Sequence, residues 1–442
     1  MKKWILLISM ALSYTTFSQD FEREKMDRFF HLIDSADRGM GSISIFANGE
    51  EVYENAFGYR VLEDSLPLNT ETQMHIGSIS KTLSAVVIMK LVQEEVLTLD
   101  EKLSEYFPEF EKADEITIEQ LLRHRSGIFN FTDAPDYAEW MEKPIEKKEL
   151  INKLVRYGRT FPPDEKFGYS NANYVLLTFI AEQATGKDFN DLLQKHVCQP
   201  CELKHTAFDD GIDPEENEAY SYDRINRWEQ STVTDRSVPL GAGAIVSTPE
   251  DLNHFLYCLN KGELLDSANL KNMMTIQDGY GIGLFAMPFY EKKAYGHTGG
   301  IDGFRAQAFY FPEEDVSISY LSNAVSWPVN NIMVGALSIY FGRNYELPEF
   351  QPRIKMSADD LIPYPGTYAG PNFPMEIIVT RNGGQLMAKG SAQGQKAFPL
   401  TPVGDDVFVY EAAGVTLKFN PATDEMIFEQ GGASYTLSKV KK

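Results

Sequence analysis

The sequence predicts an α+β fold: a mostly antiparallel sheet flanked by helices, with a helical subdomain, followed by a small all-β, barrel-like domain. Two observations predict the larger part. Strand patterns occur near both ends of the first 345 residues, and helical patterns fill the region between them. A third observation predicts the barrel, because after Glu346 short strands alternate with Gly-rich and Asn-Pro turns.

The amino-terminal elements are expected to be a helix and a hairpin. Residues 21–35 have the spacing of an amphipathic helix. Apolar residues then alternate over residues 41–59 around Asn48-Gly49, which is a strong signal for a tight turn between two strands. This hairpin supplies two strands of the sheet.

A central helix is expected after residue 78. Between residues 82 and 95, apolar residues keep helical spacing and also fill the other faces, which indicates a helix buried on most sides. Ser78 stands at its first turn and Lys81 lies three positions on, so both side chains emerge on one face. A buried amine can take the proton of a serine, and N–H groups at the helix start can hold an oxyanion. A capping serine and a surface lysine would give the same pattern, so Ser-x-x-Lys alone does not decide.

The remaining elements follow the same two periodicities. Helices and loops are expected to about residue 195, and a further apolar helix at residues 328–340. Strand patterns return at residues 281–285, 294–298, 304–311 and 316–321. Strands of the tail are expected at residues 376–380, 385–389, 407–411, 415–419, 425–428 and 435–440.

Two further motifs follow Ser-x-x-Lys along the chain. Tyr169-Ser170-Asn171 precedes an apolar helix, and His297-Thr298-Gly299-Gly300 leads into strand-like residues. Ser-x-x-Lys, Tyr-x-Asn and His-Thr-Gly in this order resemble the penicillin-recognising serine hydrolases, which include class C β-lactamases, D-alanyl-D-alanine carboxypeptidases and related esterases and D-aminopeptidases. The resemblance spans residues 41–342, and the tail resembles the lipocalin-like appendage of some relatives.

The resemblance implies roles in acyl transfer for four of these residues. Ser78 would attack a carbonyl carbon, and Lys81 and Tyr169 would accept and return its proton. The backbone N–H groups of Ser78 and Gly300 would form the oxyanion hole. Neither a metal nor a cofactor is expected to take part.

His297 is a departure from the pattern of the β-lactamases, which usually carry lysine there. Lysine offers a permanent charge to a substrate carboxylate, whereas histidine is near-neutral at pH 7 and donates a hydrogen bond. The resemblance still implies a catalytic part for His297. It also implies contacts of Asn171 with the substrate amide, and of Thr298 and Gly299 with its carboxylate side.

The leading interpretation is a serine hydrolase that forms an acyl-enzyme on amide or ester bonds. A peptidase or carboxypeptidase acting on D-aminoacyl peptides, such as cell-wall peptides, fits His-Thr-Gly best. A β-lactamase, a small-ester esterase and a catalytically silent ligand-binding protein on the same fold are the alternatives. The expected partners are accordingly a small peptide, lactam or ester, and the oligomeric state is left open.

Residues 1–18 have the basic start, short apolar segment and small residues of a cleavable secretory signal, which predicts an extracytoplasmic protein, periplasmic or secreted. No apolar run is long enough to predict stable membrane insertion. A formal net charge of −23 argues against nucleic acid as a partner. The spacing of Cys198 and Cys201 allows either a local disulfide or two unbonded thiols, and the sequence does not decide between them. Two nearby histidines are the one feature that would support a zinc site there.

The predicted order of segments is therefore a signal peptide at residues 1–18, a serine hydrolase domain at 19–345, a linker at 346–362 and a β-rich domain at 363–442.

Overall fold

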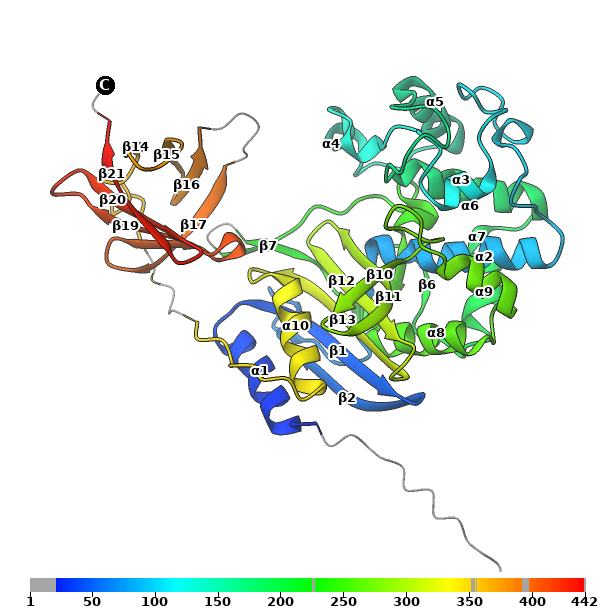
Figure 1. Ribbon diagram of the computed structural model, residues 1–442, viewed down its shortest axis with the longest axis horizontal. Coiled ribbons are helices and arrows are strands. Elements are labelled where there is room, and N and C mark those ends of the chain that lie inside the picture. Colours follow the sequence, from blue (N-terminus) through cyan, green and yellow to red (C-terminus); the bar gives the residue numbers. More distant parts are fainter. Residues whose placement is uncertain (1–20, 225–226, 351–353, 355, 392–396, 441–442) are drawn as a thin grey trace, which may run out of the picture.

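The computed structural model describes residues 21–224, 227–350, 354, 356–391 and 397–440. These residues form a main body of sheet and helices, here called the main body, and a separate β-barrel (Figure 1). The predicted signal peptide and part of the predicted linker lie outside the described residues, and the predicted domain boundaries stay a prediction. The α+β fold class is confirmed.

The sheet of the main body joins the two ends of its sequence, as predicted. Its strand order is β10–β11–β12–β13–β1–β2, with antiparallel neighbours, and β7 adds to β13 in parallel and pairs with β8. The strands are β1 (Gly39–Ala47), β2 (Glu50–Phe57), β7 (Tyr222–Arg224), β8 (Trp228–Gln230), β10 (Phe285–Phe289), β11 (Lys292–Ile301), β12 (Phe304–Phe311) and β13 (Val316–Val325).

Helices cover both faces of this sheet. One apolar core lies between the sheet and the helices α1 and α10, and a larger core lies on the opposite face, under α8 and the helical subdomain (Figure 1). The helices are α1 (Arg23–Ser35), α2 (Ser80–Gln93), α3 (Ile118–Leu122), α4 (Tyr137–Trp140), α5 (Lys147–Tyr157), α6 (Asn171–Thr185), α7 (Phe189–Leu193), α8 (Pro249–Lys261), α9 (Ser267–Met274) and α10 (Val329–Tyr340).

The predicted central helix is α2. Nearly all its residues are buried, because its apolar side chains cover every face and helices and sheet surround it. A 3-10 turn, Gly77–Ile79, precedes it and carries Ser78. A small sheet fixes the approach to this turn, because β5 (Met74–His75) pairs with β9 (Ile245–Ser247), which also pairs with β6 (Ala207–Phe208).

The prediction of a strand at residues 281–285 was wrong. A strand begins only at Phe285, because the preceding residues turn back against α2. Gly283 has φ +69°, and a Cβ atom there would lie 2.7 Å from the carbonyl oxygen of Lys81. Thr82 Oγ1 donates to the carbonyl oxygen of Gly283 over 2.6 Å, so this turn packs against the first turn of α2.

The tail forms a closed antiparallel barrel, as predicted, with an interior filled by apolar side chains such as Leu386, Phe408 and Leu417. The prediction missed β14 and β17. Pro399 and Pro402 concealed β17, where a bulge follows Pro402. The strands are β14 (Gly366–Ala369), β15 (Ile377–Asn382), β16 (Gln385–Gly390), β17 (Phe398–Gly404), β18 (Val407–Tyr410), β19 (Val415–Asn420), β20 (Glu425–Gln430) and β21 (Ala433–Lys439).

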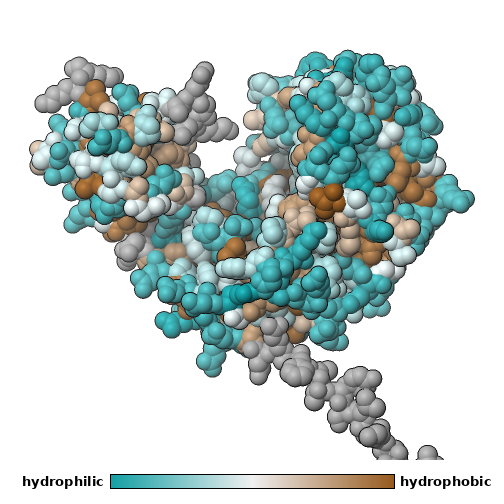
Figure 2. Space-filling view, viewed as in Figure 1, coloured by the Kyte–Doolittle hydropathy of each residue, from teal (hydrophilic) through white to brown (hydrophobic). Residues whose placement is uncertain are grey.

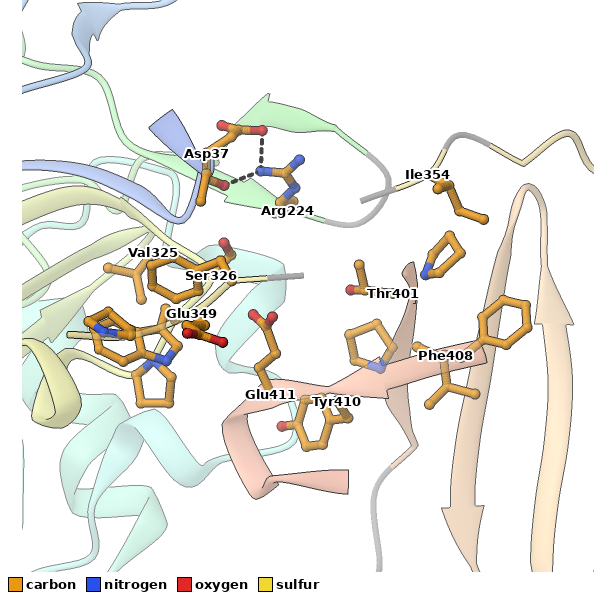
Figure 3. Close-up of a pocket in the computed structure, with 18 of the residues that line it drawn as sticks. Asp37, Arg224, Val325, Ser326, Glu349, Ile354, Thr401, Phe408, Tyr410 and Glu411 are labelled. Atoms are coloured by element: carbon orange, nitrogen blue, oxygen red, sulfur yellow. Dashed lines mark hydrogen bonds and ion pairs between the residues drawn. The ribbon is translucent and has the colours of Figure 1, made fainter. Parts of the chain in front are cut away.

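An ion pair joins the barrel to the main body. Arg38 is fully buried, and its Nη2 lies 2.8 Å from Glu411 Oε1 at the end of β18. Beside it runs a crevice of about 2070 Å³, where Asp37 and Arg224 pair on the main-body side and Tyr410 and Glu411 lie on the barrel side (Figure 3). In the space-filling view, a notch separates the barrel from the helical subdomain (Figure 2).

Cys198, Cys201 and Cys258 are buried free thiols, so the local disulfide that the spacing left open does not form in this structure. Within the described part of the chain, no helix is both long and apolar enough to cross a bilayer.

Candidate active site

Lys81 lies fully buried beside Ser78. Its Nζ lies 3.0 Å from Ser78 Oγ, 2.7 Å from Asn171 Oδ1 and 2.7 Å from the carbonyl oxygen of Ala242. Desolvation by burial lowers the pKa of Lys81 well below its ordinary value, and in the described part of the chain no carboxylate pairs with it. Asn171 Oδ1 and the Ala242 carbonyl oxygen can each accept one N–H of this amine, so in its neutral form the lone pair faces Ser78 Oγ.

Tyr169 approaches the same oxygen from a second direction. Its Oη donates to Ser78 Oγ over 2.9 Å, and Lys81 Nζ lies 5.0 Å from the centre of its ring. Burial raises the pKa of Tyr169, so its phenol stays protonated through the neutral range. The serine hydroxyl is therefore held between a desolvated amine and a proton donor.

Both ends of the Asn171 amide are occupied. Its Oδ1 accepts from Lys81, and its Nδ2 donates to Asn130 Oδ1 over 3.0 Å and to Thr132 Oγ1 over 3.2 Å. Asn130 Oδ1 also accepts from the backbone N–H of Asn171 over 3.0 Å, which fixes the start of α6. These contacts place Asn171 against Lys81, whereas the sequence predicted a contact with substrate.

Two glycines bring β11 against the turn that carries Ser78. Gly77 has φ +51°, and a Cβ atom there would lie 2.7 Å from the backbone nitrogen of Gly300. A Cβ atom on Gly299 would lie 1.9 Å from the carbonyl oxygen of Ile76. Only glycine permits this approach, which sets the Gly300 nitrogen beside the segment that leads into Ser78.

His297 is buried and neutral. Its Nδ1 lies 2.5 Å from the carbonyl oxygen of Thr298, which can only accept, so the proton is on Nδ1. Its Nε2 therefore accepts from Tyr280 Oη, 3.0 Å away. Desolvation lowers the pKa of His297 to about 3. Its ring centre lies 6.3 Å from that of Tyr169, but no hydrogen bond joins His297 to Ser78, Lys81 or Tyr169 among the described residues.

His124 supports Tyr169 from behind. Its Nδ1 accepts from the backbone N–H of Ser170 over 3.2 Å and lies 3.1 Å from Asn173 Nδ2, and its ring centre is 4.3 Å from that of Tyr169. Burial lowers the pKa of His124 well below its ordinary value, so this ring too is uncharged. A compact group of aromatic rings, Tyr169, Tyr280, His124 and His297, thus borders the serine.

Comparison with known proteins identifies the family. Residues 20–335 match the family model described as Beta-lactamase. The chain belongs to the Beta-lactamase family. Members of this family are serine hydrolases, and this chain is therefore a serine hydrolase.

Curated proteins are similar to most of the chain. Penicillin-binding protein 4* of Bacillus subtilis (strain 168) is 25% identical over 450 residues, covering 93% of this chain and 97% of that protein. Teichoic acid D-alanine hydrolase of Staphylococcus aureus is 24% identical over 296 residues, covering 64% of this chain and 70% of that protein.

Solved structures are similar as well. D-amino acid amidase from Ochrobactrum anthropi SV3, complexed with L-phenylalanine, superimposes with a TM-score of 0.61 at 26% identity, covering 67% of this chain and 91% of that one. The octameric penicillin-binding protein homologue from Pyrococcus abyssi has a TM-score of 0.66 at 23% identity and covers 94% of this chain and 100% of that one, which shows a shared fold that includes the barrel.

The structure brings Ser78, Lys81, Tyr169 and Asn171 together, and the sequence analysis missed the groups that support them. Tyr280, Asn130 and the carbonyl of Ala242 carry no motif of their own, although Ala242 lies in a stretch that resembles family sequence. A carbonyl group is present at every residue, so no side-chain pattern could have marked it.

Proposed function

We propose that this chain hydrolyses amide bonds of D-aminoacyl peptides through an acyl-enzyme on Ser78. The observation that carries the proposal is the position of Ser78 Oγ between Lys81 Nζ, at 3.0 Å, and Tyr169 Oη, at 2.9 Å. A hydroxyl within hydrogen-bond distance of an uncharged base is the arrangement that activates a serine.

In the first half of the reaction, neutral Lys81 takes the proton of Ser78 as Oγ attacks the substrate carbonyl carbon. The backbone N–H groups of Ser78 and Gly300 stabilise the negative charge that develops on the carbonyl oxygen, which is worth roughly 3 kcal/mol per donor in related acyl transfers. Asn171 and the Ala242 carbonyl orient the amine by accepting its two N–H groups.

In the second half, protonated Tyr169 gives its proton to the departing amine and recovers one from Lys81. A water molecule then attacks the acyl-enzyme, with the same groups acting in reverse. Tyr169 can give a proton to the departing amine only if its phenol is protonated when the reaction begins, and its raised pKa agrees with this.

The choice of amide substrates rests on two supports. Relatives include proteins described as D-amino acid amidase and teichoic acid D-alanine hydrolase, so D-configured acyl groups recur among them. The second support is His297, which is buried and neutral and stands where the β-lactamases that this chain resembles usually carry a lysine. Export to an extracytoplasmic location, through the predicted signal at residues 1–18, belongs to the same proposal.

Intact mass spectrometry of the purified protein with benzylpenicillin tests the chemistry. We expect a penicilloyl adduct on the wild type and none on Ser78→Ala. A hydrolysis panel of a D-alanyl peptide, nitrocefin and 4-nitrophenyl butyrate then tests the substrate class. Fast turnover of nitrocefin alone contradicts the peptidase assignment, and no reaction with any of these compounds contradicts acyl-enzyme chemistry at Ser78.

A further inference from the structure

Three buried thiols, those of Cys198, Cys201 and Cys258, have no part in the candidate active site. Cys198 ends the π-helical turn Gln194–Cys198 that follows α7, Cys201 lies three residues later, and Cys258 lies on α8. We propose that Cys201 and Cys258 form a disulfide bond under oxidising conditions, in place of the local bond that the spacing left open. The inference goes beyond the proposed function, and only the occurrence of the bond in the cell depends on the proposed export.

Asp251 fixes the segment after Cys201 against the first turn of α8. Its Oδ1 accepts from the backbone N–H of Lys204 over 3.2 Å, and its Oδ2 accepts from the backbone N–H of His205 over 2.7 Å. Thr206 Oγ1 also donates to Oδ2, over 2.8 Å. Because three donors converge on one buried carboxylate, the position of this segment relative to α8 is well defined.

The register of α8 then brings Cys258 to Cys201. Cys258 follows Asp251 by two helical turns, so the two side chains lie on one face, about 10 Å apart along the helix axis. The chain from Lys204 back to Cys201 can span about the same distance. The thiols of Cys201 and Cys258 are in hydrogen-bond contact, which is the proximity that a disulfide requires.

Cys198 is directed away from this pair. Its Sγ donates to the carbonyl oxygen of Thr206 over 3.4 Å, and a bond through Cys198 would give up this contact. Cys258 Sγ instead contacts Glu263 Oε2, 3.5 Å away, and Glu263 is exposed. Water can replace the thiol at this carboxylate, so the geometry favours a bond between Cys201 and Cys258.

The oxidant is itself a disulfide, either a small molecule such as oxidised glutathione or a protein disulfide. The Cys201 thiolate attacks one sulfur of the oxidant, which forms a mixed disulfide and releases one thiolate. The Cys258 thiolate then attacks Cys201 Sγ and releases the second thiolate. The two cysteines lose two protons and two electrons, and the oxidant is reduced to two thiols. The hydrogen bond to Cys258, together with burial, raises the pKa of Cys201, so thiolate is scarce in the folded chain and the bond should form mainly during folding.

The bond closes a loop that contains Ala242 and β9. The carbonyl oxygen of Ala242 accepts from Lys81, and β9 pairs with β5, which leads into the turn that carries Ser78. A disulfide restricts the unfolded chain and thereby favours the folded one. The bond between Cys201 and Cys258 therefore stabilises the segment that orients Lys81.

Disulfide mapping after refolding tests the proposal. The reduced, unfolded wild type is refolded with oxidised glutathione, free thiols are blocked with iodoacetamide, and a tryptic digest is analysed by mass spectrometry without reduction. We expect the peptide that contains Cys258 to be linked to the peptide that contains Cys198 and Cys201, with the alkyl group on Cys198. The Tm of the refolded protein should exceed its Tm in dithiothreitol by roughly 5 °C.

Cys198→Ala is the matched control, because it removes a neighbouring buried thiol and leaves the proposed pair intact. It should keep the cross-link and the Tm difference, whereas Cys201→Ala and Cys258→Ala should lose both. A bond that involves Cys198, or three alkylated cysteines in the refolded wild type, overturns the proposal. The wild-type map decides even where a variant fails to fold. Equal Tm values with and without dithiothreitol overturn the stabilising role.

Discussion

Lys81 and His75 are basic side chains on either side of Ser78, and both are buried, but their surroundings are opposite. Lys81 makes hydrogen-bond contacts with three uncharged groups and has no acidic neighbour among the described residues. His75 makes no hydrogen bond through either ring nitrogen within the described structure, and its Nε2 lies 3.7 Å from Asp209 Oδ1. Its ring stacks on that of Phe304, with centres 5.1 Å apart.

The difference shows what separates a base from a packed side chain. Desolvation lowers both pKa values, but Asp209 and Asp302 oppose the effect at His75, whereas nothing opposes it at Lys81. Only Lys81 also has a hydroxyl within reach of its lone pair. Burial alone therefore does not make a side chain a catalytic base. The side chain must also have uncharged hydrogen-bond partners and lie within reach of the nucleophile, as Lys81 does.

The largest effect should come from removing each basic group in turn. Lys81→Met should slow acylation of Ser78 by benzylpenicillin by about 10⁴-fold or more, because no base remains. His75→Gln should stay within about 3-fold of the wild type. Rates from intact mass spectrometry at pH 7, with circular dichroism to confirm folding, measure both. Equal losses of acylation rate in the two variants would contradict the assignment of Lys81, and not His75, as the base.

Tyr169→Phe should have the next largest effect. The variant keeps the ring and its packing but lacks the proton donor, so kcat for a D-alanyl peptide should fall by about 10²–10⁴-fold with a smaller change in KM. Steady-state kinetics check this, and a KM effect without loss of kcat would count against proton transfer through Tyr169.

Asn171→Asp gives Lys81 the acidic neighbour that His75 already has. A carboxylate in place of the Asn171 amide, which lies 2.7 Å from Nζ, should raise the pKa of Lys81 and keep more of it protonated at neutral pH. Acylation at pH 7 should fall by about 10- to 100-fold and recover as the pH rises. Asn171→Ala is the control, since a loss that no pH restores would indicate misplacement of Lys81.

The smallest effect concerns stability near His75. Its pKa is lower in the folded than in the unfolded chain, so the unfolded chain binds more protons between those two values. Stability is therefore complete above about pH 6.5 and falls as the pH drops below it. His75→Gln should show a Tm decrease from pH 7 to pH 5 that is smaller than that of the wild type by about 1–3 °C. Parallel Tm curves would contradict the assignment.

Much of this site could be predicted because its side chains lie in motifs. Ser78 and Lys81 share a helical face by spacing alone, and alternation marked β11 and β12. The turn at Gly283 could not be predicted, because its cause is a close approach to Lys81 from a distant segment. The same holds for Asn171, whose contact with Lys81 spans 90 residues.

The barrel shows the same limit. Its strands were found where turns of Gly and Asn punctuate them, as around β19 and β20, and missed where proline interrupts the pattern, as in β17. Closure of the barrel depends on β14 pairing with β21, and that long-range contact is not visible in any local pattern.

The pH dependence of Ser78 acylation by benzylpenicillin tests the central claim, that Lys81 is an uncharged base, most directly. Acylation needs the neutral amine, so its rate should rise with pH through the lowered pKa of Lys81 and level off well below pH 10. The raised pKa of Tyr169 should keep the plateau intact up to at least that pH. A rate that still climbs through pH 10, near the ordinary pKa of lysine, would show that Lys81 is charged at neutral pH and would contradict the account.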